Sequence, residues 1–170
     1  MTSLAELDAH VTKGGEDDEK LPSFTFKRVT RQVKGKQVRG DGVKGRVLRS
    51  EMVDVTRDNV TKKKLVMEVE LVEESRGGIV EKVNDDDGNE VTKYANFPAG
   101  TKVTVWVGNS PGFEAVRDAV AGAGGAAIED GAIIEYWLDA HKETGKTYPL
   151  NLFGAIYTPP VRATSIDEFE

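Results

Sequence analysis

The chain has 170 residues, a net charge of −6 at pH 7 and no cysteine. Its length suits one domain of ordinary size, and the lack of cysteine excludes disulfides, zinc–thiolate sites, iron–sulfur clusters and thiol catalysis. With only two histidines, a metal site built from several histidines of one chain is excluded as well. No apolar run has the roughly 18 residues that a membrane span needs, and the first residues lack the basic and apolar regions of a secretory signal. We therefore expect a cytoplasmic protein with no membrane segment.

The positive charge is concentrated in residues 27–64. This window holds 13 Lys and Arg against four acidic residues, so it carries +9, and the rest of the chain carries −15. A local excess of this kind is typical of a surface that binds nucleic acid. Charge alone also leaves open a solvated basic surface without a ligand.

Residues 1–41 are predicted to form a flexible arm that is acidic at first and then basic. Glu16–Glu19 make the first part acidic, and the Lys and Arg residues of 27–39 make the second part basic. Phe24 and Phe26 alternate with polar residues, so the arm has room for one short strand.

Two long strands are predicted after residue 42. Apolar and polar residues alternate over 43–47 and again over 65–71, the pattern of half-buried strands. Gly45 is the candidate for a β-bulge in the first of them. Residues 57–64 are predicted to be a strongly basic loop that joins the two strands into a hairpin.

A second hairpin is predicted over residues 79–97, with its turn at Asp87-Gly88. Residues 101–107 then alternate most cleanly of all and predict a strand. Because its valines share one face, Lys102, Thr104 and Trp106 are expected on the opposite, outward face.

One helix is predicted after this strand. Ser110 is the candidate N-cap, Pro111 suits the first helical position, and Gly122 with the glycines after it ends the helix. Two more strands are predicted at residues 132–141 and 150–157.

Without the 79–97 hairpin, the predicted order is three strands, one helix and two strands. This is the order of the OB-fold, a five-stranded barrel of Greek-key topology. We therefore predict a mainly β protein with a five-stranded OB-fold barrel over residues 42–160, one helix between strands 3 and 4, an inserted β-hairpin and flexible termini. Residues 161–170 would form an acidic tail. Another small β-barrel, or a sandwich with one capping helix, is the alternative.

The sequence gives little sign of catalysis or of a cofactor. Gly40–Gly45 has the glycine spacing of a dinucleotide-binding loop, but it precedes a strand, whereas that loop must open a helix. The carboxylate pairs lie on exposed alternating faces, which does not provide the differing environments that general acid–base catalysis needs. We expect no enzyme, no cofactor and no metal site.

The informative combination is basic residues beside aromatic residues on strands. Single-stranded nucleic acid is bound by cations that neutralise its phosphates and by flat side chains on which bases stack. Trp106 and Trp137 are both predicted to point outward from their strands, although burial of Trp106 under the inserted hairpin is an alternative. The candidate nucleic-acid-binding residues are Lys44, Arg46, Lys62, Lys63, Lys64, Lys102, Trp106 and Trp137.

Four segments carry a family resemblance: GVKGRVL at 42–48, EAVRDAVAGAG at 114–124, IEDGAIIEYW at 128–137 and LNLFGAIYTPP at 150–160. With them, residues 42–160 resemble the OB-fold single-stranded DNA-binding proteins of bacteriophages, particularly phages of actinobacterial hosts. The resemblance implies sequence-tolerant binding of single-stranded DNA in replication or recombination, without a cofactor and commonly as a homo-oligomer. The long acidic hairpin and the rich basic stretch before residue 40 depart from the family pattern.

The end of the chain also resembles the acidic tip of bacterial single-stranded DNA-binding proteins. In such tips carboxylates surround an aromatic residue, and partner proteins dock there; the matching residues here are Asp167, Glu168 and Phe169. The resemblance implies replication or recombination proteins as partners. The alternative functions are a virion structural protein, such as a tail or capsid-decoration β-domain, and a partner-binding adaptor without nucleic acid.

Overall fold

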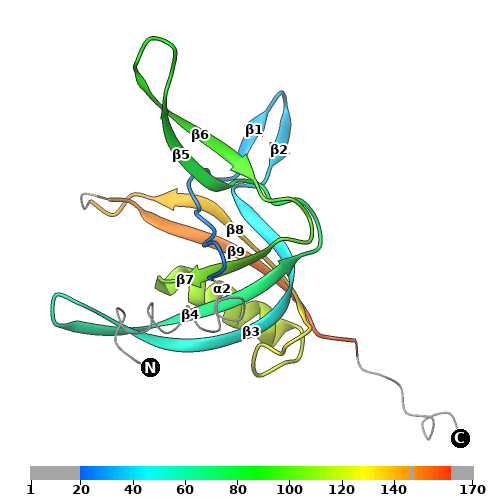
Figure 1. Cartoon of the computed structure of the whole chain (residues 1–170). Coiled ribbons are helices and arrows are strands. Elements are labelled where there is room, and N and C mark those ends of the chain that lie inside the picture. Colours follow the sequence, from blue (N-terminus) through cyan, green and yellow to red (C-terminus); the bar gives the residue numbers. More distant parts are fainter. Residues whose placement is uncertain (1–19, 146–147, 162–170) are drawn as a thin grey trace, which may run out of the picture.

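The computed structural model describes residues 20–145 and 148–161. Its main sheet has five antiparallel strands in the order β7-β4-β3-β8-β9 (Figure 1). The strands are β3 (Gly42–Arg57), β4 (Val60–Leu71), β7 (Lys102–Val107), β8 (Ile133–Lys142) and β9 (Leu150–Thr158). The prediction of a mainly β protein with a five-stranded sheet is confirmed. The edge strands β7 and β9 are not paired with each other in this sheet.

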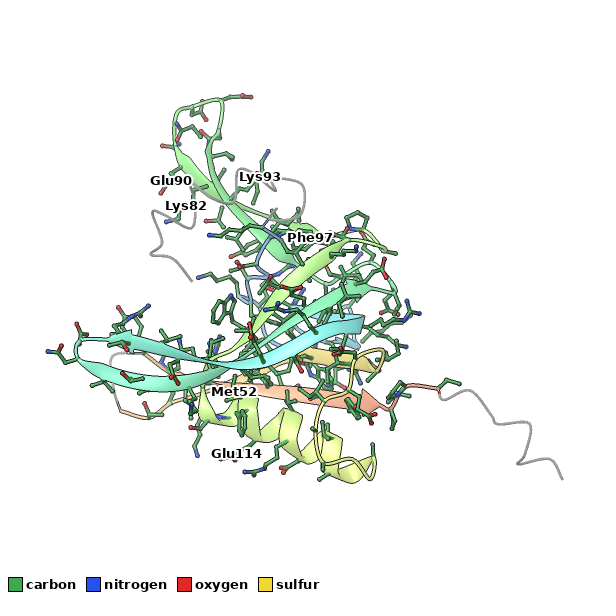
Figure 2. All side chains as sticks on the ribbon, turned by 60° about the horizontal axis from the view of Figure 1, so that its bottom comes forward. Met52, Lys82, Glu90, Lys93, Phe97 and Glu114 are labelled. Carbon is green, nitrogen blue, oxygen red and sulfur yellow. The ribbon has the colours of Figure 1, made fainter. Side chains whose placement is uncertain are left out.

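Two small hairpins project from the main sheet. One consists of β5 (Gly78–Asn84) and β6 (Glu90–Asn96) and confirms the predicted inserted hairpin. Figure 2 shows its Lys82, Glu90 and Lys93 far from the helix, with Phe97 at its base. The other hairpin consists of β1 (Arg31–Val33) and β2 (Lys36–Val38) and was not predicted.

The hairpin of β3 and β4 differs from the prediction in two ways. Its turn is only Asp58-Asn59, both with positive φ, because these residue types tolerate the left-handed conformation of a tight turn. The basic residues predicted in a loop at 57–64 therefore lie mainly on β4. The bulge lies between Val47 and Arg49, not at Gly45. Gly45 instead allows close approach, since a Cβ there would lie 2.8 Å from the carbonyl oxygen of Glu70.

Helix α2 (Ser110–Gly122) lies where it was predicted, but Asn109 rather than Ser110 is its N-cap. The Asn109 side-chain oxygen accepts a hydrogen bond from the Gly112 N–H at 2.8 Å, and its amide donates to the Asn151 carbonyl at 3.0 Å. An amide group can form both bonds at once, whereas a serine hydroxyl is too short to reach β9 as well. The cap therefore fastens α2 to β9, against which the helix packs.

Residues 22–30 contact both edges of the main sheet. The N–H of Phe24 donates to the Thr104 carbonyl on β7 at 2.9 Å, and the Phe26 ring packs edge-on against Phe153 of β9 at 5.4 Å. Phe24 is only 5% exposed. The predicted boundary between a flexible arm and a domain at residue 42 is therefore wrong for residues 20–41. Their phenylalanines fill the core that β7 and β9 leave open.

The core lies between the curved main sheet, α2 and residues 22–30. Asp41 is the one charged side chain that is fully buried among the described residues. Its carboxylate accepts hydrogen bonds from the Lys27 and Arg28 backbone N–H groups and from the Arg28 guanidinium, at 2.8–2.9 Å. These bonds attach the N-terminal segment to the start of β3. Among the described helical residues, no stretch is both long and apolar enough to pass through a lipid bilayer.

Candidate nucleic-acid interface

Trp106 points outward from β7, as predicted. The valines of β7 are buried, while Lys102 and Trp106 are exposed, and 43% of the Trp106 side chain is accessible. The inserted hairpin therefore does not bury Trp106, so the alternative of a second small core beneath that hairpin is wrong. A large flat apolar group on the outer face of a strand is a suitable surface for stacking.

Two lysines of β4 extend the outer face beyond Trp106. Trp106 pairs in register with Val66, and Lys64 lies two residues further along β4 on the same face. The Lys64 ammonium lies over Gly108, where an added Cβ would be 3.4 Å from its nitrogen. Lys62 and Lys64 also line a hollow of about 340 Å³ beside the β3–β4 turn. The Trp106 indole and the ammonium groups of Lys64 and Lys62 therefore follow one another along the outer face of the sheet.

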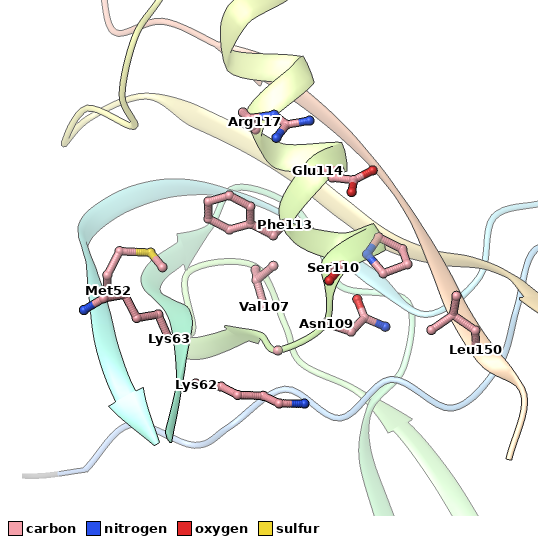
Figure 3. A pocket seen from close by; sticks show the side chains of 12 residues that line it. Met52, Lys62, Lys63, Val107, Asn109, Ser110, Phe113, Glu114, Arg117 and Leu150 are labelled. Carbon is pink, nitrogen blue, oxygen red and sulfur yellow. The ribbon is translucent and has the colours of Figure 1, made fainter. Parts of the chain in front are cut away.

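Lys63 differs from its two neighbours. Side chains alternate along a strand, so it points to the opposite face from Lys62 and Lys64. Its ammonium pairs with Asp54 at 3.0 Å. With Met52 and Phe113 it lines a groove of about 800 Å³ between the β3–β4 hairpin and the first turns of α2 (Figure 3). Lys63 and Lys64 thus line different hollows, and Lys62 borders both this groove and the smaller hollow beside the turn.

The outer face between β3 and β4 carries paired charges. Arg46 lies 3.6 Å from Glu70, and Arg49 lies 3.5 Å from Glu68. These exposed pairs are weak, but each places a carboxylate where a phosphate would have to approach the arginine of that pair. In the described part of the chain, no acidic side chain lies within 4.0 Å of the ammonium groups of Lys44, Lys62, Lys64 or Lys102.

Trp137 lies far from Trp106. Trp137 lies opposite Gly42 of β3 in the strand register. Trp106 lies opposite Val66 of β4, which in turn lies opposite Glu51 of β3. Three strand spacings and nine residues of β3 separate the two indoles, on the order of 30 Å along the sheet. The structure therefore does not bring the two predicted stacking residues into one site.

The environment of Trp137 includes a residue that the sequence reasoning missed. The Arg39 guanidinium lies over the indole, 4.0 Å from the ring centre, and pairs with Glu135 at 2.8 Å. The ring also lies against Gly154 of β9, where a Cβ would be 2.3 Å from it. The basic composition of residues 27–39 was the available signal for Arg39, but its place over Trp137 depends on the register of β3 with β8.

The three predicted partner-binding residues, Asp167, Glu168 and Phe169, lie outside the described residues. Within the described ranges, no group of three or more metal-ligating side chains is arranged to bind a metal ion. No family model matches this chain, and no curated protein or solved structure is significantly similar to it.

Proposed function

We propose that this protein binds single-stranded DNA without sequence preference and that its main sheet is an OB-fold barrel. The strand order and the place of α2 between β7 and β8 support this fold. Counted within the main sheet, β4 and β7 are the second and third strands. OB-folds bind oligonucleotides on the face of these strands and with the loop between the first two. Here that face holds Lys62, Lys64, Lys102 and Trp106.

The observation that carries the proposal is the exposed Trp106 indole between Lys64 and Lys102. Neither ammonium has an acidic side chain within 4.0 Å in the described part of the chain, although Glu70 lies opposite Lys102 in register. Lys64 lies beyond Trp106 along the neighbouring strand, and Lys102 lies on the same strand as Trp106, on the same face. A base can stack on the indole while the flanking ammonium groups contact the phosphates on either side. Neither contact depends on base identity, so binding would tolerate any sequence.

Replacement of Trp106 by alanine tests this function. Trp106→Ala is expected to weaken binding of a labelled dT oligonucleotide by about 1–3 kcal/mol, the usual contribution of one stacked base. Fluorescence anisotropy at two salt concentrations measures it, and Trp106→Phe, which keeps an aromatic ring, should retain most of the affinity. Equal affinity of the alanine variant, with an unchanged melting temperature, would remove Trp106 from the interface.

A role in phage replication or recombination is part of the proposal and follows from the family resemblance of residues 42–160. Asp167, Glu168 and Phe169 would then bind partner proteins of those processes. The second candidate is a virion structural protein, which the projecting β5–β6 hairpin favours. A virion protein should give no retarded dT oligonucleotide in a gel at low salt.

A further inference from the structure

The β1–β2 hairpin stands directly over Trp137. At one end of the hairpin, the Thr30 hydroxyl donates to the Asp139 carboxylate at 3.0 Å, and the same carboxylate oxygen accepts from the Trp137 indole N–H at 3.1 Å. At the other end, Arg39 covers the indole. Both ends of the hairpin are thus attached to β8 on either side of this ring.

The base of the hairpin is rigidly packed. The Gly40 N–H donates to the Thr30 hydroxyl at 3.0 Å, which closes the hairpin base. A Cβ on Gly40 would lie only 2.0 Å from the Leu138 carbonyl oxygen, so backbone from three segments meets here. A hairpin of three-residue strands is marginal by itself, and this close attachment keeps it in one position relative to Trp137.

The hairpin beyond this base is basic and uncovered. Arg31, Lys34 and Lys36 are exposed, and residues 31–38 contain no acidic residue. Lys34 occupies the turn with a φ of 51°, a conformation that lysine rarely adopts and that puts its side chain at the tip.

We propose that the β1–β2 hairpin, together with the Arg39–Trp137 stack, is a second contact for the same single strand of DNA. This inference rests on the proposed function. Lys44 and Lys102 lie on the outer face between the two tryptophans and provide cations along the way. The separation of about 30 Å corresponds to roughly nine nucleotides at the stacked rise of 3.4 Å per nucleotide. That length falls within the roughly 4–16 nucleotides that one OB-fold binds.

A matched pair of double variants tests the second contact. Lys34→Ala/Lys36→Ala removes two cations from the basic hairpin, and Lys82→Ala/Lys93→Ala removes two from the exposed β5–β6 hairpin. For dT20, the first is expected to flatten the slope of log K against log salt by about 1.4, since each phosphate contact contributes about 0.7 on a single strand. The second should leave the slope unchanged. A dT4 strand bound at Trp106 is too short to reach the β1–β2 hairpin. We therefore expect both double variants to bind dT4 with the wild-type affinity.

The two tryptophans of the chain give an independent readout. In Trp106→Phe, Trp137 is the sole tryptophan, and dT20 should quench its fluorescence; adding Lys34→Ala/Lys36→Ala should reduce that quenching. If wild type binds dT20 but neither slope nor quenching depends on Lys34 and Lys36, the second contact is refuted and the proposed function stands. An altered oligomeric state of the Lys34/Lys36 variant with an unchanged slope also refutes it, and makes the hairpin a protein interface. Failure of wild type to bind dT20 refutes both.

Discussion

The phenol of Tyr136 is buried beneath the first turn of α2. Its ring stacks on Phe153 with 4.8 Å between the centres, and its hydroxyl has no hydrogen-bond partner among the described residues. Burial also raises the pKa of this phenol. A Cβ on Gly112 would lie 2.2 Å from the Tyr136 oxygen. Gly112 is therefore a glycine because of this contact rather than because of its backbone conformation.

This contact reverses the usual effect of a glycine-to-alanine change in a helix. Alanine normally stabilises a helix interior by about 1 kcal/mol relative to glycine. Gly112→Ala should instead lower the free energy of unfolding by about 1–3 kcal/mol, the usual cost of overpacking. In a Tyr136→Phe background, where the nearest oxygen is absent, the same change should cost much less, because the closest remaining atom is the Asn109 side-chain oxygen at 3.0 Å. Urea denaturation of wild type, the two single variants and the double variant measures the coupling between the two changes. Strictly additive changes in the free energy of unfolding would contradict the contact.

At the scale of elements, the three consecutive lysines of β4 are expected to contribute differently to DNA binding, because side chains alternate along a strand. Lys62→Ala and Lys64→Ala are each expected to flatten the slope of log K against log salt by about 0.7 for single-stranded DNA. Lys63→Ala should leave it unchanged, because Lys63 points to the opposite face and pairs with Asp54. Equal slopes for the three single variants would show that the direction of a lysine side chain on β4 does not decide whether it contacts DNA.

The elements that the sequence predicted well have strong periodicity. The alternation of β7 determined both its limits and the outward direction of Trp106, and the Asp87-Gly88 turn located the β5–β6 hairpin. The β1–β2 hairpin was missed because its strands have three residues and its Lys34-Gly35 turn is not a usual turn pair. The lysine run of β4 predicts a loop from the sequence, because a run of like residues has no alternation.

The candidate site was predictable only in part, for a related reason. Alternation indicates which side chains share a face of one strand, and this was sufficient for Lys102 with Trp106. The distance between Trp106 and Trp137 depends on register across four strands and on the bulge after Val47, which no local pattern specifies. The stack of Arg39 on Trp137 depends on the same register.

At the scale of the whole molecule, stability depends on residues outside the long strands. Phe24 is 5% exposed and packs beside Phe26 and Phe97. Phe24→Ala should lower the free energy of unfolding by about 3–5 kcal/mol, the usual cost of deleting a buried phenylalanine. Phe113→Ala is the control, since 38% of Phe113 is exposed and its loss should cost much less. Thermal unfolding measures both, and equal effects of the two variants would contradict a larger contribution of the buried Phe24 ring to the core.

The attachment of residues 22–30 also bears on how the chain folds as it is made. The Phe24 N–H donates a hydrogen bond to the Thr104 carbonyl, and the Thr30 hydroxyl donates to Asp139, 109 positions later. At a synthesis rate of about 5–20 residues per second, Thr30 is added to the chain roughly 5–22 s before Asp139. Contacts between such distant residues close large loops and slow folding. The segment translated early is thus among the last to dock, and until then its phenylalanines are accessible to chaperones and to other nascent chains.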